Sequence, residues 1–119
     1  MRKIWLVLKV VLAIFLILGG VQHFISPTNY IPFVPSFLPF TMAIIYISGL
    51  FEILFGLALF FKKHETIGAW GILILMLLFL PIHIWDVFSE TPAIGSHNAA
   101  LIRLPVQFLL IFIAWKVKN

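Results

Sequence analysis

The chain has 119 residues, of which 63% are hydrophobic and only 10% are charged, and its formal net charge is +4. A soluble domain carries about 25% charged residues, so this chain lacks the polar side chains that a water-facing surface requires. The composition therefore excludes an ordinary soluble domain and indicates an integral membrane protein, while the lack of cysteine excludes disulfides, thiolate zinc sites and thiol relays.

Four hydrophobic segments are long enough to cross a bilayer core about 30 Å thick, which takes about 20 helical residues. We expect an all-α fold, an integral membrane four-helix bundle forming a single domain, with helices at residues 4–24, 41–61, 66–86 and 98–116. The first segment follows Met1-Arg2-Lys3 and also has the form of a signal peptide. Since no small-residue cleavage site follows it, we interpret it as an uncleaved first helix.

The second connection, Lys62 to Glu65, is a short turn, so the second and third helices are expected to be antiparallel neighbours. The first connection, ISPTNYIPFVPSFLPF (25–40), contains four prolines, which argue against a regular helix or a central strand. Its aromatic residues are too apolar for a solvated linker. We expect an ordered loop in the outer membrane interface that partly covers the mouth of the bundle. The third connection, 87–97, is rich in turn residues around Thr91-Pro92 and Gly95-Ser96.

The positions of lysine and arginine predict the orientation of these helices. With the N-terminus inside, every Lys and Arg except Arg103 lies at the cytoplasmic face. This bias predicts that both termini are cytoplasmic, and it argues against the dual topology of small four-helix multidrug exporters. Because the cations cluster at the ends of hydrophobic runs, they do not indicate a nucleic-acid partner. Lys9, inside the first run, is expected to extend its amino group to the interface.

Ionisable side chains within a span are costly and usually face the interior of the bundle. At a rise of about 1.5 Å per residue, the polar side chains form a central layer and an outer rim. The central layer contains Glu52, Arg103 and Gln107, and the rim contains His23, His83 and Asp86. The depth gap of about 12 Å between Glu52 and the rim argues against a single metal site, so we predict none.

Small residues flank Glu52 on one helix face, so we expect its carboxylate to face a close helix–helix contact. An isolated carboxylate at this depth would be protonated or paired, and we expect Arg103 to be its partner and Gln107 to hydrogen-bond it. Pro81 and Pro105 loosen the third and fourth helices beside these residues, as is common in helices that line cavities. The alternative is that the same polar contacts only hold helices together.

Several blocks of the sequence resemble the DoxX-like family of bacterial membrane proteins, over nearly the whole chain. They are GGVQHFISPTNY (19–30), SGLFEILFGLALF (48–60), the third-helix segment that ends in proline and polar residues, and RLPVQFLLIFIAW (103–115). The resemblance implies a four-helix bundle in the bacterial cytoplasmic (inner) membrane. It also implies an association with quinone-linked oxidation and with partners in redox defence.

Three functional hypotheses follow. In the first, an intramembrane site binds a quinone or another small lipophilic molecule, as the membrane subunit of a redox system. Glu52 and Arg103 would then act on protons, and His23, His83, Asp86 and Gln107 would contact the substrate. Electrons would come from a partner protein, because no haem, flavin or iron–sulfur motif is visible. The second hypothesis is a non-catalytic assembly or scaffold subunit, and the third is a proton-coupled transporter. The sequence leaves open whether the chain forms a homo-oligomer.

Overall fold

The computed structural model describes residues 2–34, 37–89, 94 and 96–118. Within these ranges the chain forms four long α-helices and one short 3₁₀ helix. They are α1 (Arg2–Ile25), η1 (Pro27–Phe33), α2 (Thr41–Ala58), α3 (Glu65–Phe88) and α4 (His97–Val117). The prediction of an all-helical chain with four long apolar helices is confirmed. The largest difference is at the end of α2, which stops at Ala58 rather than at residue 61.

Each of the four α-helices is long and apolar enough to cross a membrane, judged by length and composition. Many large apolar side chains on all four helices point outward, for example Leu18, Phe51, Leu78 and Ile102. Such an exterior suits contact with lipid better than contact with water.

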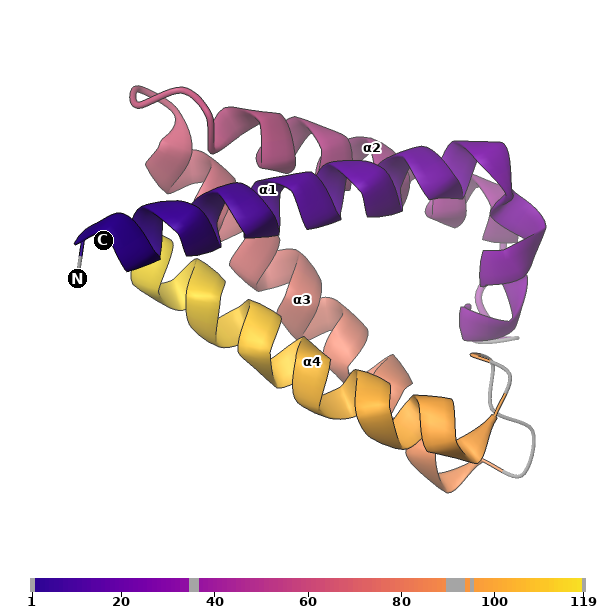
Figure 1. Cartoon of the computed structure of the whole chain (residues 1–119). Helices are drawn as coiled ribbons and strands as arrows, with labels where there is room; N and C mark the ends of the chain where they lie inside the picture. Colours follow the sequence, from indigo (N-terminus) through magenta and orange to yellow (C-terminus); the bar gives the residue numbers. More distant parts are fainter. Residues whose placement is uncertain (1, 35–36, 90–93, 95, 119) are drawn as a thin grey trace.

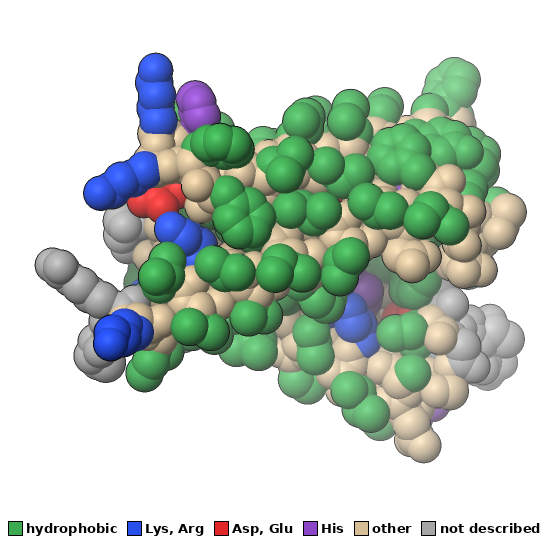
Figure 2. Space-filling model, turned by 45° about the horizontal axis from the view of Figure 1, so that its top comes forward, with side chains coloured by type: hydrophobic (Ala, Val, Ile, Leu, Met, Phe, Trp, Pro, Cys, Tyr) green, Lys and Arg blue, Asp and Glu red, His purple; other side chains and the backbone are tan. Residues whose placement is uncertain are grey.

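The helices associate as two pairs, α1 with α2 and α3 with α4 (Figure 1). The pairs lie close together at the end that holds both termini and diverge toward the end that holds η1 (Figure 1). We call these two parts of the molecule the terminal half and the η1 half. Lys and Arg side chains gather at the outer end of the terminal half (Figure 2). This divergence determines where space is left between the helices.

Glycines allow α1 and α2 to approach closely. A Cβ added at Gly20 would lie 2.5 Å from the carbonyl oxygen of Gly49, and one added at Gly49 would lie 2.5 Å from the Cβ of His23. One added at Gly56 would lie 3.0 Å from the carbonyl oxygen of Ala13. Since a side chain at any of these positions would force its neighbours to shift, these small residues set the spacing of the pair. The expected close helix contact beside Glu52 is therefore present, and α1 supplies it.

The terminal half contains the hydrophobic core. Its fully buried members come from several helices and include Leu12, Leu16, Ile72 and Met76. Lys9 Nζ lies 2.9 Å from Glu65 Oε2 in a partly exposed ion pair, and the position of its amino group at a membrane interface stays a prediction. Glu65 is the first residue of α3, so this contact links α1 to α3 in the terminal half.

The connection between α1 and α2 differs from the prediction in one respect, because it begins as the 3₁₀ helix η1. Pro27 lies in its first turn, where a backbone N–H has no helical partner, and the φ of proline suits 3₁₀ geometry. Pro32 is tolerated inside it. The predicted turn at Thr91-Pro92 and the loop proline Pro35 lie outside the described residues.

Candidate functional site

A cavity of about 830 Å³ lies between the two helix pairs in the η1 half. All four helices and η1 contribute to its lining. Most of these side chains are apolar, and the polar ones are His23, Asn29, Tyr30, Ser48, Glu52, His83 and Arg103. Basic and histidine side chains are visible in a hollow between the two helix pairs in Figure 2. The volume lies within the range of about 300–1,000 Å³ that is usual for small-molecule sites.

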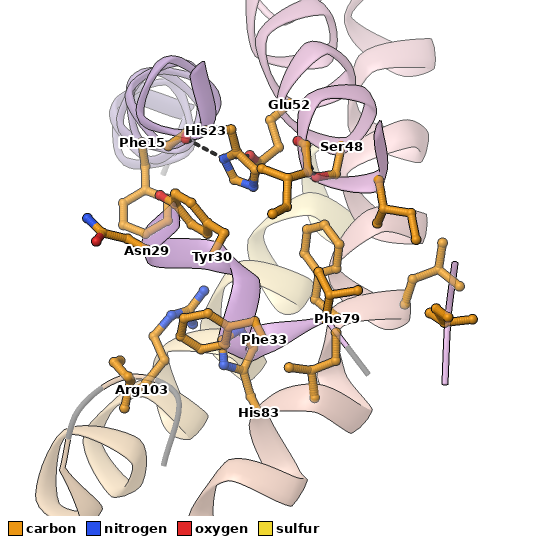
Figure 3. Close-up of a pocket in the computed structure, with 18 residues that line it drawn as sticks. Phe15, His23, Asn29, Tyr30, Phe33, Ser48, Glu52, Phe79, His83 and Arg103 are labelled. Carbon is orange, nitrogen blue, oxygen red and sulfur yellow. Dashed lines mark hydrogen bonds and ion pairs between the residues drawn. The ribbon is translucent and has the colours of Figure 1, made fainter. Parts of the chain in front are cut away.

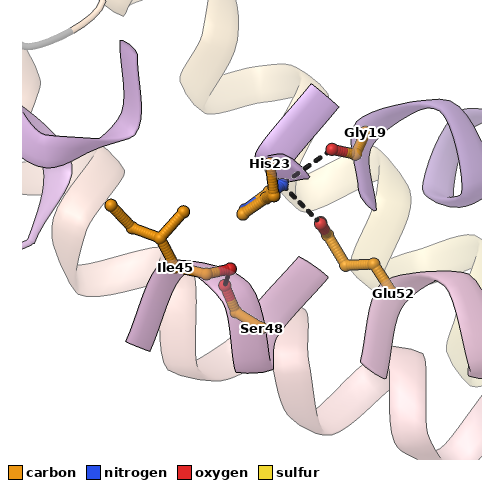
Figure 4. A network of polar contacts seen from close by, with 5 residues as sticks. All are labelled: Gly19, His23, Ile45, Ser48 and Glu52. Carbon is orange, nitrogen blue, oxygen red and sulfur yellow. Dashed lines mark hydrogen bonds and ion pairs between the residues drawn. The ribbon is translucent and has the colours of Figure 1, made fainter. Parts of the chain in front are cut away.

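One wall of the cavity is formed by α1 and α2, and its polar centre is Glu52 with His23 (Figure 4). Both side chains are buried, with 8% and 7% of their surface exposed. His23 Nδ1 lies 2.7 Å from the carbonyl oxygen of Gly19 and 3.1 Å from Glu52 Oε2. Because a carbonyl can only accept, Nδ1 carries a proton and donates it to Gly19.

This arrangement leaves Glu52 incompletely satisfied. Its Oε2 is buried and has no hydrogen-bond partner among the described residues, although the imidazole of His23 lies beside it. On the same wall, Ser48 Oγ donates its proton to the carbonyl oxygen of Ile45 at 2.9 Å. The α1–α2 wall therefore presents oxygen lone pairs to the cavity. A buried acceptor without a donor costs about 1–3 kcal/mol, so such a group calls for a ligand or a water.

The opposite wall is formed by α3 and α4 and carries His83 and Arg103 (Figure 3). In the part of the chain that the structure describes, His83 Nδ1 and one guanidinium nitrogen of Arg103 are buried without a hydrogen-bond partner. The prolines that were expected to mark this wall, Pro81 and Pro105, are exposed and are absent from the lining. Both walls therefore hold buried polar atoms that face the same space.

The predicted ion pair between Glu52 and Arg103 is not formed within the described residues, where the ionisable side chain beside Glu52 is His23. The glycine contacts press α2 against α1, and the divergence of the pairs carries α4 away from both. Glu52 and Arg103 nevertheless line one cavity, from opposite walls. The two residues thus face each other across the cavity instead of forming a contact.

Two other predicted site residues lie away from the cavity lining. Asp86 is 4% exposed and accepts a hydrogen bond from the backbone N–H of Ile94 at 3.2 Å, which ties the end of α3 to the following connection. Gln107 is fully buried and donates to the carbonyl oxygen of Met76 at 2.7 Å, so it joins α4 to α3 and does not contact Glu52. Both residues act as structural contacts here.

Two aromatic residues of η1 complete the site, and the sequence did not single them out. Tyr30 stacks on His23 with ring centroids 4.0 Å apart, and the ring of Phe33 meets His83 edge-on at 6.0 Å. They are three residues apart, and side chains at this spacing lie on the same side of a 3₁₀ helix. In the sequence, this spacing of two aromatic residues is the feature that could have predicted their place in the site. η1 thereby bridges the two walls.

Burial raises the pKa of the Tyr30 phenol above its ordinary value, and the negative charge of Glu52 raises this pKa further. Tyr30 is therefore a neutral hydroxyl at physiological pH. Among the described residues, no group of three or more His, Cys, Asp or Glu side chains is placed to hold a metal ion.

Residues 12–118 match the model of a protein family that is described as a domain of unknown function (DUF8561). The chain belongs to this family. The match covers η1, α2, α3 and α4 completely and α1 from residue 12 onward, and it therefore includes every residue of the cavity lining. No curated protein and no solved structure matches the chain.

Proposed function

We propose that the chain is an integral membrane protein of the bacterial cytoplasmic membrane, with four spans and both termini on the cytoplasmic side. The length and apolar character of the four helices support the spans. The Lys and Arg side chains at the terminal half support this orientation, since positive residues favour the cytoplasmic side. In this orientation the η1 half lies in the outer part of the membrane, and η1 lies at the outer interface.

The cavity of the η1 half, in this proposal, binds a small lipophilic molecule, and a quinone is the favoured ligand. One observation carries the proposal: buried polar atoms without hydrogen-bond partners in the described structure face one apolar cavity from both of its walls. A planar molecule with oxygen atoms at its two ends would bring a polar group to each wall. The aromatic side chains Tyr30, Phe33 and Phe79 lie between the walls and offer surfaces for its ring (Figure 3).

The chain would serve as the membrane subunit of a redox system. Reduction of a quinone to a hydroquinone takes two electrons and two protons. The electrons would come from a redox partner protein, and both protons would come from water by way of Glu52, which lines the cavity. Membership of the DoxX-like proteins, suggested by the sequence resemblance, is part of this proposal.

The test is to purify the chain from native membranes, extract the bound lipids and measure binding of added quinone and of its reduced hydroquinone form. We expect a quinone in the extract and saturable binding, and we expect Glu52→Gln to weaken hydroquinone binding about tenfold, because it removes a buried acceptor for a ligand hydroxyl. Glu65→Gln is the matched control, because Glu65 lies at the other end of the molecule and contacts Lys9. If no quinone is extracted and none binds saturably, the proposal is wrong.

A scaffold without chemistry of its own is the second candidate. The observation that favours it is that His23 and Glu52 link α1 to α2 and Gln107 links α4 to α3, as polar contacts between membrane helices do. The double variant in which Glu52 and Arg103 are both replaced by apolar residues, Met and Leu, distinguishes the scaffold from the ligand site. A scaffold keeps its biological phenotype after this change, whereas a ligand site loses it at normal folding and abundance.

A further inference from the structure

We propose that the cavity recognises a phenol-type ring, with its hydroxyl directed at the α1–α2 wall and a second oxygen directed at the α3–α4 wall. In the quinone class this means that the reduced hydroquinone binds in preference to the oxidised quinone. The inference rests on the proposed function and deepens it, because it names the chemical form of the ligand.

The α1–α2 wall offers hydrogen-bond acceptors. Ser48 Oγ donates its proton to Ile45, so the lone pairs of that oxygen remain for a ligand. Glu52 Oε2 is buried without a hydrogen bond among the described residues. The proton on Nδ1 of His23 goes to the carbonyl oxygen of Gly19, and a neutral imidazole of this tautomer has its lone pair on Nε2. A ligand atom here is best matched when it carries a proton to donate.

The α3–α4 wall offers a hydrogen-bond donor that cannot act as an acceptor. The guanidinium of Arg103 has N–H donors and no acceptor, and one of its nitrogens is buried without a partner within the described ranges. His83 Nδ1 is also without a partner there, and it donates or accepts according to the tautomer. A ligand oxygen at this wall is best matched when it accepts.

The space between the walls suits an aromatic ring. Figure 3 places Glu52 and Ser48 on one side and Arg103 and His83 on the other, with aromatic rings between them. Those rings belong to Tyr30, Phe33 and Phe79. A ligand ring that stacks here extends one substituent toward each wall, so the two walls act on the two ends of one molecule.

The two redox forms of a quinone differ in the property that these walls distinguish. A quinone has carbonyl oxygens at both ends, and carbonyls only accept. One carbonyl suits Arg103, whereas the other faces the lone pairs of Glu52 and Ser48. A hydroquinone has hydroxyls, which both donate and accept, so it satisfies both walls. The preference therefore follows from which side chains face the cavity.

The first experiment measures binding of decylubiquinone and of its hydroquinone to the purified full chain in nanodiscs under anaerobic conditions. We expect the hydroquinone to bind about tenfold more tightly, the effect of leaving one buried acceptor without a hydrogen-bond donor. Equal binding, or tighter binding of the quinone, overturns the inference while leaving the proposed function intact. If neither form binds, the proposed function fails, and the second pair of probes decides the inference.

That second pair is 4-octyloxyphenol and its methyl ether, in which a methyl group replaces the hydroxyl proton. We expect the phenol to bind at least about tenfold more tightly than the ether. Equal binding of the two probes, or no binding of the phenol, overturns the inference. Since this pair needs no quinone, it separates the failure of the inference from the failure of the proposed function.

Variants then assign the selectivity to the α1–α2 wall. Glu52→Gln replaces a carboxylate by an amide that also donates, so the ratio of hydroquinone to quinone affinity is expected to fall toward one. Ser48→Ala removes a single acceptor and is expected to lower the same ratio less, and it serves as the second variant if Glu52→Gln fails to fold. Glu65→Gln is the control and leaves the ratio unchanged, since Glu65 lies at the opposite end. A ratio that neither Glu52→Gln nor Ser48→Ala changes contradicts the assignment.

Discussion

The terminal half and the η1 half are built from the same four helices, yet they are stabilised in different ways. In the terminal half, apolar side chains such as Leu16 and Ile72 fill the interior, and the Lys9–Glu65 contact ties α1 to α3. In the η1 half the helix pairs diverge, and the interior is a cavity with buried polar atoms on both walls. A packed end holds the bundle together, so the other end can hold polar groups that packing alone would not favour.

The largest expected effect tests the packed end. Ile72→Ala should lower the free energy of unfolding by about 2–5 kcal/mol, because it leaves a void among fully buried side chains. Phe79→Ala in the same helix should cost less, because Phe79 is half-buried and already borders the cavity. Equilibrium unfolding in mixed micelles measures both. A larger cost for Phe79→Ala would reverse the comparison between the two halves.

The next effect concerns the glycine contact that places Glu52 beside α1. Gly49→Leu should lower the free energy of unfolding by about 1–3 kcal/mol, since even a Cβ at this position meets His23. Leu50→Ala, one residue further along, alters an exposed side chain and should have little effect. If Gly49→Leu is tolerated as well as Leu50→Ala, the close α1–α2 contact is wrong.

A smaller effect is expected for the ion pair at the terminal end. A double-mutant cycle with Lys9→Met and Glu65→Gln should give a coupling energy of about 0–1 kcal/mol, because both side chains are partly exposed. A coupling of several kcal/mol would mean that this end depends on charge rather than on apolar packing. High salt should reduce the coupling further.

The smallest effect is a titration in the η1 half. In a Tyr46→Phe background Tyr30 is the sole tyrosine, and its pKa should lie above the ordinary value of about 10. Because the folded state holds the phenol proton more tightly than the unfolded state, this contribution to stability is complete below pH about 10 and is lost as the pH rises through the raised pKa. Tyrosinate absorbance measures the titration. Glu52→Gln should lower the pKa only in part, since burial is the larger cause. An ordinary pKa would mean that Tyr30 is not buried against His23.

Helix positions could be predicted because long apolar runs separated by turn residues have few alternatives in a membrane. The close contact beside Glu52 could also be predicted, since Ser48, Gly49 and Gly56 surround that residue along one helix face. The sequence did not indicate that α1 is the helix that supplies this contact. Depth along a span places Glu52 and Arg103 at similar levels, but it does not say which helices are paired.

Missing information on which helices and faces meet also explains why Asp86 and Gln107 were predicted in the site but lie outside the cavity lining. α3 and α4 are apolar on nearly every face, so the sequence does not indicate which face meets a cavity and which meets a neighbouring helix. Gln107 turned out to face Met76, and Asp86 to cap the following connection. Tyr30 and Phe33 were expected only among the loop aromatics that cover the mouth of the bundle, because prolines argue against a regular helix, although a 3₁₀ turn accommodates them.

The most direct test of the central claim is native mass spectrometry of the full chain released from native membranes. We predict a bound small molecule on the wild-type chain and on Glu65→Gln, and its loss or marked depletion on Glu52→Gln. Folding of each variant is checked by its helix content in the same detergent. A wild-type chain that carries no bound molecule, or a bound mass that Glu52→Gln does not reduce, would contradict the account.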